Sequence, residues 1–171
     1  QQIFADVFDA EAAFPAIFAL IAGGIAVASI VNARLVVRLG SRRISHTALI
    51  GFTSVAAVHA GVALSGHESI WTFSILQTLT MFCFGLIAGN FGSMAMETMG
   101  KIAGTASSVQ GFISTIGGSL LGFAIGQQFN GTVAPMTLGF TGFGLTALAF
   151  VLFAERGKLF RAQHAATPAK A

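Results

Sequence analysis

The sequence predicts an all-α integral membrane protein with five spanning helices. Hydrophobic residues make up 54% of the 171-residue chain and charged residues only 9%, whereas a soluble domain carries about a quarter charged residues. The mean hydropathy of +0.81 is higher than a water-soluble domain of this size can accommodate. In addition, the few charged residues divide the chain into apolar segments, and each spanning helix needs roughly 20 apolar residues.

The first three apolar segments each have the length of one spanning helix. Between Glu11 and Arg34 lie 22 uncharged residues, between Arg43 and Glu68 lie 24, and between Glu68 and Glu97 lie 28. These intervals predict helices near 13–34, 45–65 and 70–95.

The last apolar region is long enough for two helices. It runs from Ile102 to Ala154 and holds 53 uncharged residues, too many for a single crossing. Its middle, QQFNGTVAP from Gln127 to Pro135, combines amides, Asn-Gly and Pro, which is typical of a turn. We therefore expect helices near 103–126 and 133–154. The expected domain is residues 1–155, a transmembrane bundle, followed by a basic, disordered tail at 156–171.

The basic residues all fall on one side of this arrangement. Alternating crossings place one set of helix ends on the side of the C-terminus, and that set contains every Lys and Arg of the chain: Arg34, Arg38, Arg42, Arg43, Lys101, Arg156, Lys158, Arg161 and Lys170. The opposite side carries only acids: Asp6, Asp9, Glu11 and Glu68. Since Lys and Arg are retained in the cytoplasm, the sequence predicts a multi-pass protein with a cytoplasmic C-terminus.

The arginine-rich stretch NARLVVRLGSRR, residues 32–43, lies between the first two predicted helices. Its spacing resembles the loop signature G-x-L-A-D-R-x-G-R-R of the major facilitator superfamily, and the matching residues are Leu35, Arg38, Gly40 and Arg42. Ala33 and Val37 stand where the signature has its opening glycine and its acid. A glycine at position 40 allows a tight turn, and the arginines are suited to helix C-terminal carbonyls or lipid phosphates.

These departures are typical of the copy of the signature between helices eight and nine. The residues before it, QQIFADVFDAEAAFPAIFALIAG, resemble the end of helix seven, an outer loop and helix eight of the bicyclomycin-resistance (Bcr/CflA) family of drug-efflux proteins. In that family helix eleven commonly begins with a segment similar to KIAGTASSVQGF, here Lys101 to Phe112. The resemblance therefore implies helices 8–12, with the end of helix 7, of a twelve-helix bundle.

The same resemblance implies a function and a set of partners. The chain would be the C-terminal part of a proton-coupled multidrug antiporter, which works by alternating access in the bacterial inner membrane. Its partners would be membrane lipid, a small hydrophobic drug-like substrate and the N-terminal half, either in the same chain or separate. Every Asp and Glu lies at a predicted helix end or in a loop, so the group that titrates during transport is expected in that missing part.

Polar residues within the spans are the candidates for a substrate cavity, because such residues face a bundle interior. Gln77, Met81 and Phe84 recur at helical spacing on one face. A neutral amide beside an adaptable and an aromatic side chain suits a hydrophobic drug. An interhelical hydrogen bond with packing neighbours explains the same pattern equally well.

Two further patterns predict contacts between helices. Asn90 and Gln110 are expected at similar depths on consecutive helices and therefore as an interhelical hydrogen-bonded pair. Glycines four residues apart predict close helix approach, and they are Gly85 and Gly89 on the third helix and Gly118, Gly122 and Gly126 on the fourth.

Other function classes find less support in the sequence. A membrane enzyme would need a metal or nucleophile set within the spans, but His46, His59 and His67 are scattered, so no enzyme, metal or cofactor is expected. Nine basic residues in three short segments form no continuous nucleic-acid footprint. The remaining alternative is a non-transporting polytopic membrane subunit or a truncated remnant, which the upstream sequence would distinguish from a transporter.

Overall fold

The computed structural model describes residues 1–157, 159 and 160. Within these residues five helices are long and apolar enough to cross a membrane, and no strand is present. The all-α class and the number of spans are thus confirmed. The long helices are α2 (Phe14–Leu39), α3 (Ser41–Leu64), α4 (Ile70–Met96), α5 (Ala103–Gly126) and α6 (Ala134–Ala154), and the short ones are α1 (Gln2–Asp6), η1 (Glu11–Ala13) and η2 (Gly100–Ile102).

The arginine-rich stretch is almost entirely helical, although the sequence predicts a loop there. Helix α2 continues past Arg34 to Leu39, and α3 begins at Ser41, so Gly40 alone separates them. Gly40 has φ 77° and ψ 152°, a backbone conformation that glycine adopts without the clash of a Cβ. The helix end predicted at Arg34 was wrong because it was placed at a charged residue rather than at a helix-breaking one. Long arginine side chains can extend to water from within a helix.

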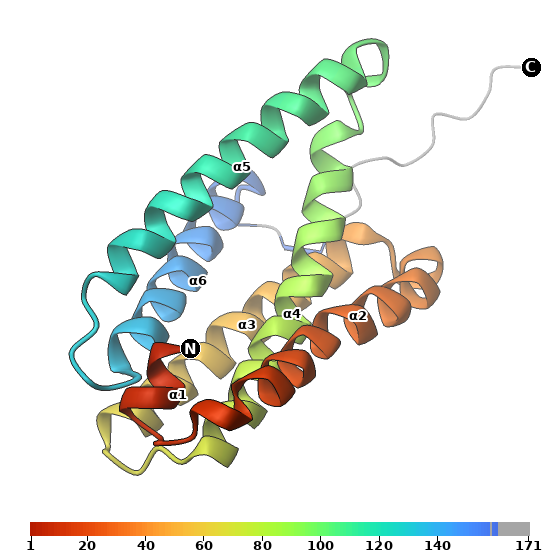
Figure 1. Ribbon diagram of the computed structural model, residues 1–171. Coiled ribbons are helices and arrows are strands. Elements are labelled where there is room, and N and C mark those ends of the chain that lie inside the picture. The colour runs from red at the N-terminus through yellow and green to blue at the C-terminus, as the bar shows by residue number, and fades with distance from the viewer. Residues whose placement is uncertain (158, 161–171) are drawn as a thin grey trace, which may run out of the picture.

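Helix α4 packs between α2 and α3, and α6 packs on the other side of α3 (Figure 1). Glycines allow close contacts where α4 meets α2 and where α6 meets α3. A Cβ added to Gly85 would lie 2.8 Å from the Cβ of Ala28 in α2, and one added to Gly144 of α6 would lie 2.6 Å from Thr53 Oγ1 in α3. The glycine spacing predicted close helix approach at Gly85, and α2 lies against α4 there. Gly144 has no glycine four residues away, so the sequence analysis did not identify its contact with α3.

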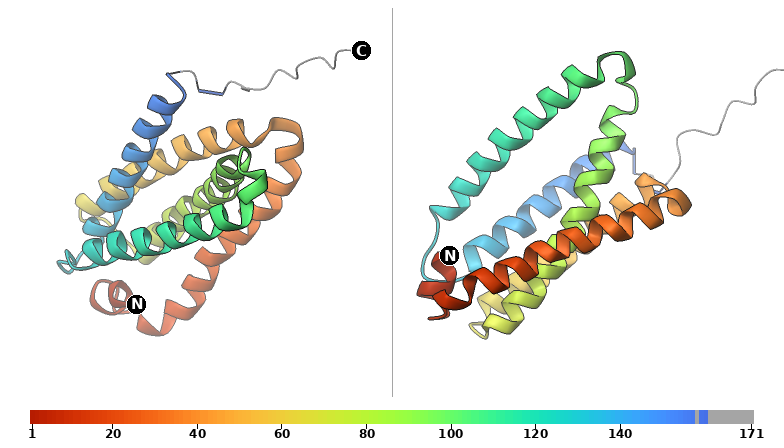
Figure 2. Two further views of the ribbon diagram at one scale, coloured as in Figure 1. Left: turned by 90° about the horizontal axis from the view of Figure 1, so that it is seen from above. Right: turned by 45° about the vertical axis from the view of Figure 1, so that its right-hand side comes forward.

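Helix α5 stands apart from the others, as Figure 2 shows. None of its residues is buried. It approaches α6 where Ile125 meets Gly139 and approaches α4 where Gln110 meets Gly92. A Cβ added at any of its three spaced glycines, Gly118, Gly122 and Gly126, would have no neighbour within 4 Å among the described residues. The predicted packing role is therefore wrong within this part of the chain, because glycine spacing permits close approach but does not supply the opposing helix.

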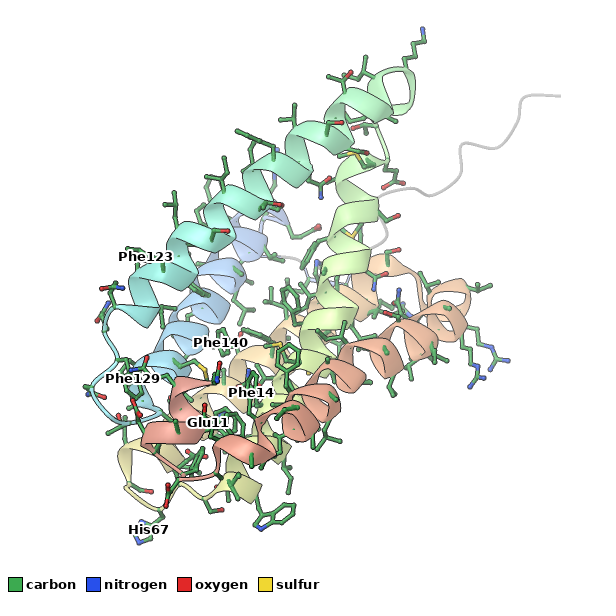
Figure 3. All side chains as sticks on the ribbon, in the orientation of Figure 1. Glu11, Phe14, His67, Phe123, Phe129 and Phe140 are labelled. Carbon is green, nitrogen blue, oxygen red and sulfur yellow. The ribbon has the colours of Figure 1, made fainter. Side chains whose placement is uncertain are left out.

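The connections alternate between two ends of the bundle. One end, called here the acidic end, holds α1, the α3–α4 connection and the α5–α6 connection, and Figure 3 labels Glu11 and His67 there. The other, called here the arginine end, holds the Gly40 turn, the α4–α5 connection and the end of α6. The charge separation is thus kept in three dimensions, while Lys158, Arg161 and Lys170 lie outside the described residues.

Aromatic packing holds α1 at the acidic end. Phe4 of α1 is 4% exposed and forms a buried cluster with Phe73 of α4 and Val133. The ring centroids of Phe4 and Phe73 lie 5.5 Å apart, edge to face. Phe14, at the start of α2 and labelled in Figure 3, lies edge to face at 5.5 Å from Phe4. The short α1 is therefore held by edge-to-face ring contacts as well as by apolar burial.

Candidate cavities and buried polar residues

The predicted substrate residues of α4 lie on one face of that helix, between its sides toward α2 and α3. Gly85 and Cys83 mark the sides of α4 that approach α2 and α3, because they lie against Ala28 and Gly51. At 100° per residue, Gln77 and Phe84 lie between these two sides, and Phe73 on the same face packs its ring against Phe4 of α1 and His59 of α3.

Burial on this face decreases along the helix. Gln77 is 7% exposed, Met81 is half-buried and Phe84 is 46% exposed. The side-chain oxygen Oε1 of Gln77 has no hydrogen-bond partner among the described residues. A buried amide oxygen without a partner costs roughly 1–3 kcal/mol, so this atom is suited to accept a hydrogen bond from a ligand or from a further polypeptide segment.

Three cavities lie elsewhere on the bundle. The first, of about 730 Å³, lies at the arginine end and is lined by Arg38, Ser41, Arg42, Arg43, Ser93 and Glu97 among others. It is called here the basic cavity. The second, of about 640 Å³, is the apolar groove, lined among others by Leu35, Leu39, Ile44, Phe82, Cys83 and Leu86. A third, of about 460 Å³, lies between α2 and α4 beside Gly24 and Phe82. Gln77, Met81 and Phe84 line none of these three.

All four residues of the recognised signature line the first two cavities. Arg38, Gly40 and Arg42 line the basic cavity, and Leu35 lines the apolar groove. The residues whose pattern predicted a connecting loop therefore line two adjacent hollows in the structure.

Asn90 pairs with a residue that the sequence analysis did not single out. Its Nδ2 donates to Oδ1 of Asn32 on α2 at 2.6 Å and to the carbonyl oxygen of Leu86 at 2.7 Å. The predicted pair of Asn90 with Gln110 is wrong, because Gln110 lies instead against Gly92, where α5 approaches α4. The signal for Asn32 was a lone amide in an apolar helix, overlooked because it was counted with the arginine stretch.

Glu68 lies in the connection between α3 and α4, yet its side chain is buried. Its Oε1 lies 3.3 Å from Nε2 of His59, and the two side chains are 7% and 1% exposed. Thr72 Oγ1 donates to the same oxygen at 3.3 Å, while Oε2 has no partner among the described residues. Burial raises the pKa of the Glu68 carboxyl above its ordinary value, and the hydrogen bond from Thr72 opposes part of that rise.

This pair changes the sequence-based expectation about titrating groups. The sequence placed all acids at helix ends or in loops and located the titrating group outside the chain. The structure brings one of those loop acids into contact with a buried imidazole, and a net neutral state of the pair retains one proton. The chain thus contains a buried carboxyl, beside an imidazole, whose pKa burial raises.

At the arginine end, charged residues join α3 to α6. Arg42 Nη1 forms an ion pair with Oε1 of Glu155, which follows the last residue of α6. His46 Nε2 lies 4.0 Å from the same oxygen, and its Nδ1 accepts a hydrogen bond of 3.1 Å from the backbone N–H of Phe160. Phe160 also lies edge to face on His46. The beginning of the tail predicted to be disordered is therefore packed against α3 at this position.

No group of three His, Cys, Asp or Glu side chains suited to hold a metal ion occurs in residues 1–157, 159 and 160. Comparisons with known proteins returned no protein family, curated protein or solved structure that matches this chain. The resemblance to the major facilitator superfamily thus remains an interpretation of the sequence motifs.

Proposed function

We propose that this chain is the C-terminal part of a proton-coupled exporter of small hydrophobic molecules, helices 8–12 of a twelve-helix major facilitator bundle in the bacterial inner membrane. The single observation that carries the proposal is the buried Oε1 of Gln77, which has no hydrogen-bond partner among the described residues, on the α4 face that also carries Met81 and Phe84. A polar atom of this kind within a membrane helix is a functional candidate.

The proposed substrate contacts lie along this face. Gln77 accepts a hydrogen bond from the substrate and so orients it. Met81 adapts its flexible thioether to compounds of different shape, and the exposed ring of Phe84 provides an aromatic surface. A single neutral acceptor among apolar side chains favours hydrophobic molecules with one donor group.

The remaining wall of the cavity comes from the N-terminal half. In transporters built from repeated bundles, the substrate lies at the interface between the two halves, which rock about it. The exposed helix α5 and exposed side chains of α4 such as Phe84 are the surfaces of this chain that such a partner would cover. The arginine end is the cytoplasmic side in this proposal, since basic residues are retained there.

The experiment uses the complete transporter that contains this chain. Gln77→Ala is compared with Gln128→Ala, which changes an exposed glutamine in the α5–α6 connection, at equal protein level. We expect Gln77→Ala to alter resistance to some compounds of a panel much more than to others, and Gln128→Ala to leave the panel unchanged. Equal resistance to every compound in the two variants removes Gln77 from the site.

A second measurement tests transport itself. The complete protein is reconstituted into vesicles, and accumulation of a fluorescent hydrophobic cation is followed after a pH gradient is imposed. Accumulation that collapses with the gradient supports a proton-coupled exporter. Absence of accumulation for every compound tested favours the alternative of a non-transporting membrane subunit.

A further inference from the structure

The basic cavity presents two arginines, Arg38 and Arg43, for which the described residues provide no ion pair. Arg42 is paired with Glu155, but the structure shows no ion pair or side-chain hydrogen bond for Arg38 or Arg43 within residues 1–157, 159 and 160. One acid, Glu97, lines the same cavity. With Arg42 already paired, Arg38 and Arg43 still outnumber it, so the cavity favours an anion.

The backbone adds to this preference. Helix α3 begins at Ser41 without a side-chain cap, and Ser41 lines the basic cavity. The unsatisfied N–H groups of a helix's first turn carry partial positive charge and bind phosphate well. Together with Arg38 and Arg43 they provide both charge and hydrogen-bond donors on one side of the cavity.

The apolar groove continues directly from the basic cavity. The two hollows share Leu39, Arg43 and Phe160. From these residues the groove extends between α2, α3 and α4 along side chains such as Ile44, Phe82 and Leu86. Among the described residues that line it, Arg43 alone is charged. A ligand that fills both hollows must therefore have an anionic end joined to an apolar end.

We propose that the basic cavity and the apolar groove together bind one anionic phospholipid. Its phosphate lies on Arg38 and Arg43, and one acyl chain occupies the groove. Charge complementarity and the position of Arg43 at the junction favour this occupant over a soluble anion, which leaves the groove empty. The proposal does not depend on transport, because it concerns two hollows that Gln77 does not line.

The single cysteine of the chain offers a direct reporter. Cys83 lines the apolar groove and is half-buried. A bound acyl chain should shield its thiol, so the rate of alkylation by a maleimide at constant pH measures occupancy. The purified full chain in detergent is mixed with phosphatidylglycerol, with phosphatidylcholine of the same acyl chains, or with inorganic phosphate.

Phosphatidylglycerol is expected to slow alkylation of Cys83 at concentrations at which the other two additives do not. Equal protection by phosphatidylcholine overturns the proposal, because the groove then takes any acyl chain regardless of charge. Protection by inorganic phosphate alone also overturns it and assigns the basic cavity to a soluble anion. No protection by any additive shows that the groove is empty.

Variants test the residues named. Arg43→Gln and Arg38→Gln should each raise the phosphatidylglycerol concentration needed for protection about fivefold. The matched control Arg34→Gln changes an exposed arginine of α2 that lines neither hollow, and it should leave the concentration unchanged. An equal effect of Arg34→Gln overturns the site and leaves only general attraction of a basic surface.

A groove-filling variant and a conservative one complete the test. Thr47 is exposed and lines the groove, so Thr47→Trp should reduce the number of phosphatidylglycerol molecules retained in native mass spectrometry. Arg43→Lys keeps the charge and should keep the protection, which distinguishes loss of binding from misfolding in Arg43→Gln. Unchanged lipid retention by Thr47→Trp places the acyl chain outside the groove and contradicts the proposal.

Discussion

Glu68 Oε1 lies 3.3 Å from His59 Nε2, and this contact joins the α3–α4 connection to the buried side of α3. Both side chains are almost fully removed from solvent, so an isolated charge on either one is costly. The pair is favoured when it retains one proton and is neutral. Loss of that proton leaves a buried carboxylate whose Oε1 has Thr72 and the His59 imidazole as neighbours and whose Oε2 has no partner among the described residues.

The first prediction concerns the pH dependence of stability. The pKa of Glu68 is raised above 4.5 in the folded protein, so the folded chain holds a proton that the unfolded chain has lost. The contribution of Glu68 to the free energy of unfolding is therefore complete when the pH is below the ordinary pKa of a Glu carboxyl. It is lost as the pH rises through the pKa of Glu68 in the folded protein. The Glu68→Gln variant does not lose this contribution. The difference between its Tm and the Tm of the unchanged protein should therefore increase with pH, by about 2–4 °C for each kcal/mol of stability that the unchanged protein loses.

The measurement is thermal unfolding in detergent at a series of pH values. Asp6→Asn is the control, because Asp6 is an exposed acid of α1 at the same end of the bundle. It should follow the unchanged protein at every pH. A constant Tm difference between Glu68→Gln and the unchanged protein across the series contradicts the prediction.

The second prediction concerns the amide pair of α2 and α4. Asn32→Ala and Asn90→Ala should each destabilise the fold, and the double variant should cost less than the sum of the two. The coupling energy is expected to be about 0.5–1.5 kcal/mol, the range of interhelical hydrogen bonds in membranes. It is measured by reversible unfolding in mixed micelles. Gln110→Ala serves as the control, and coupling between Asn90 and Gln110 of the same size would contradict the observed pairing.

The third prediction compares identical substitutions at two glycines. Gly85→Ala places a Cβ 2.8 Å from that of Ala28, whereas Gly118→Ala meets no atom within 4 Å. The gain in helix propensity is common to both. Gly85→Ala should therefore destabilise the protein by about 1–3 kcal/mol, and Gly118→Ala should be neutral or stabilising. Chemical unfolding measures both variants, and equal costs would show that the α2–α4 crossing is not tight.

The fourth prediction concerns the ion pair at the arginine end. Glu155→Gln keeps the shape of the side chain but removes the negative charge that pairs with Arg42, and should lower the free energy of unfolding by about 1–3 kcal/mol. The control Glu97→Gln changes an exposed acid at the same end and should stay within about 0.5 kcal/mol. Combining Glu155→Gln with Arg42→Gln should recover part of the loss. A double variant that is no more stable than Glu155→Gln alone would contradict a direct pair.

Local sequence patterns determined which segments form the spans. The bounds expected for the fourth and fifth helices, 103–126 and 133–154, lie within one residue of α5 and α6, because each apolar segment exchanges water for lipid on its own and needs no neighbour to do so. The position of charged residues at the helix ends follows from the same local cost of moving a charge into the bilayer, and the gathering of Lys and Arg at one end follows from their retention on the cytoplasmic side. Gly40 was identified as a turn because its chemistry is also local.

The contacts between helices were decided only by the tertiary structure. Whether Asn90 meets Asn32 or Gln110 depends on the rotation and tilt of three helices, and in lipid no hydrophobic force selects among nearly equal apolar faces. The spaced glycines of α4 and α5 look alike in sequence. Among the described residues, however, a neighbouring helix lies against Gly85 of α4, whereas no atom lies within 4 Å of a Cβ added to the spaced glycines of α5. Glu68 was read as a loop acid because its burial depends on His59, nine residues earlier in the chain and brought near by the turn between α3 and α4. Such pairings arise from shape and from non-local hydrogen bonds, which no single segment of the sequence encodes.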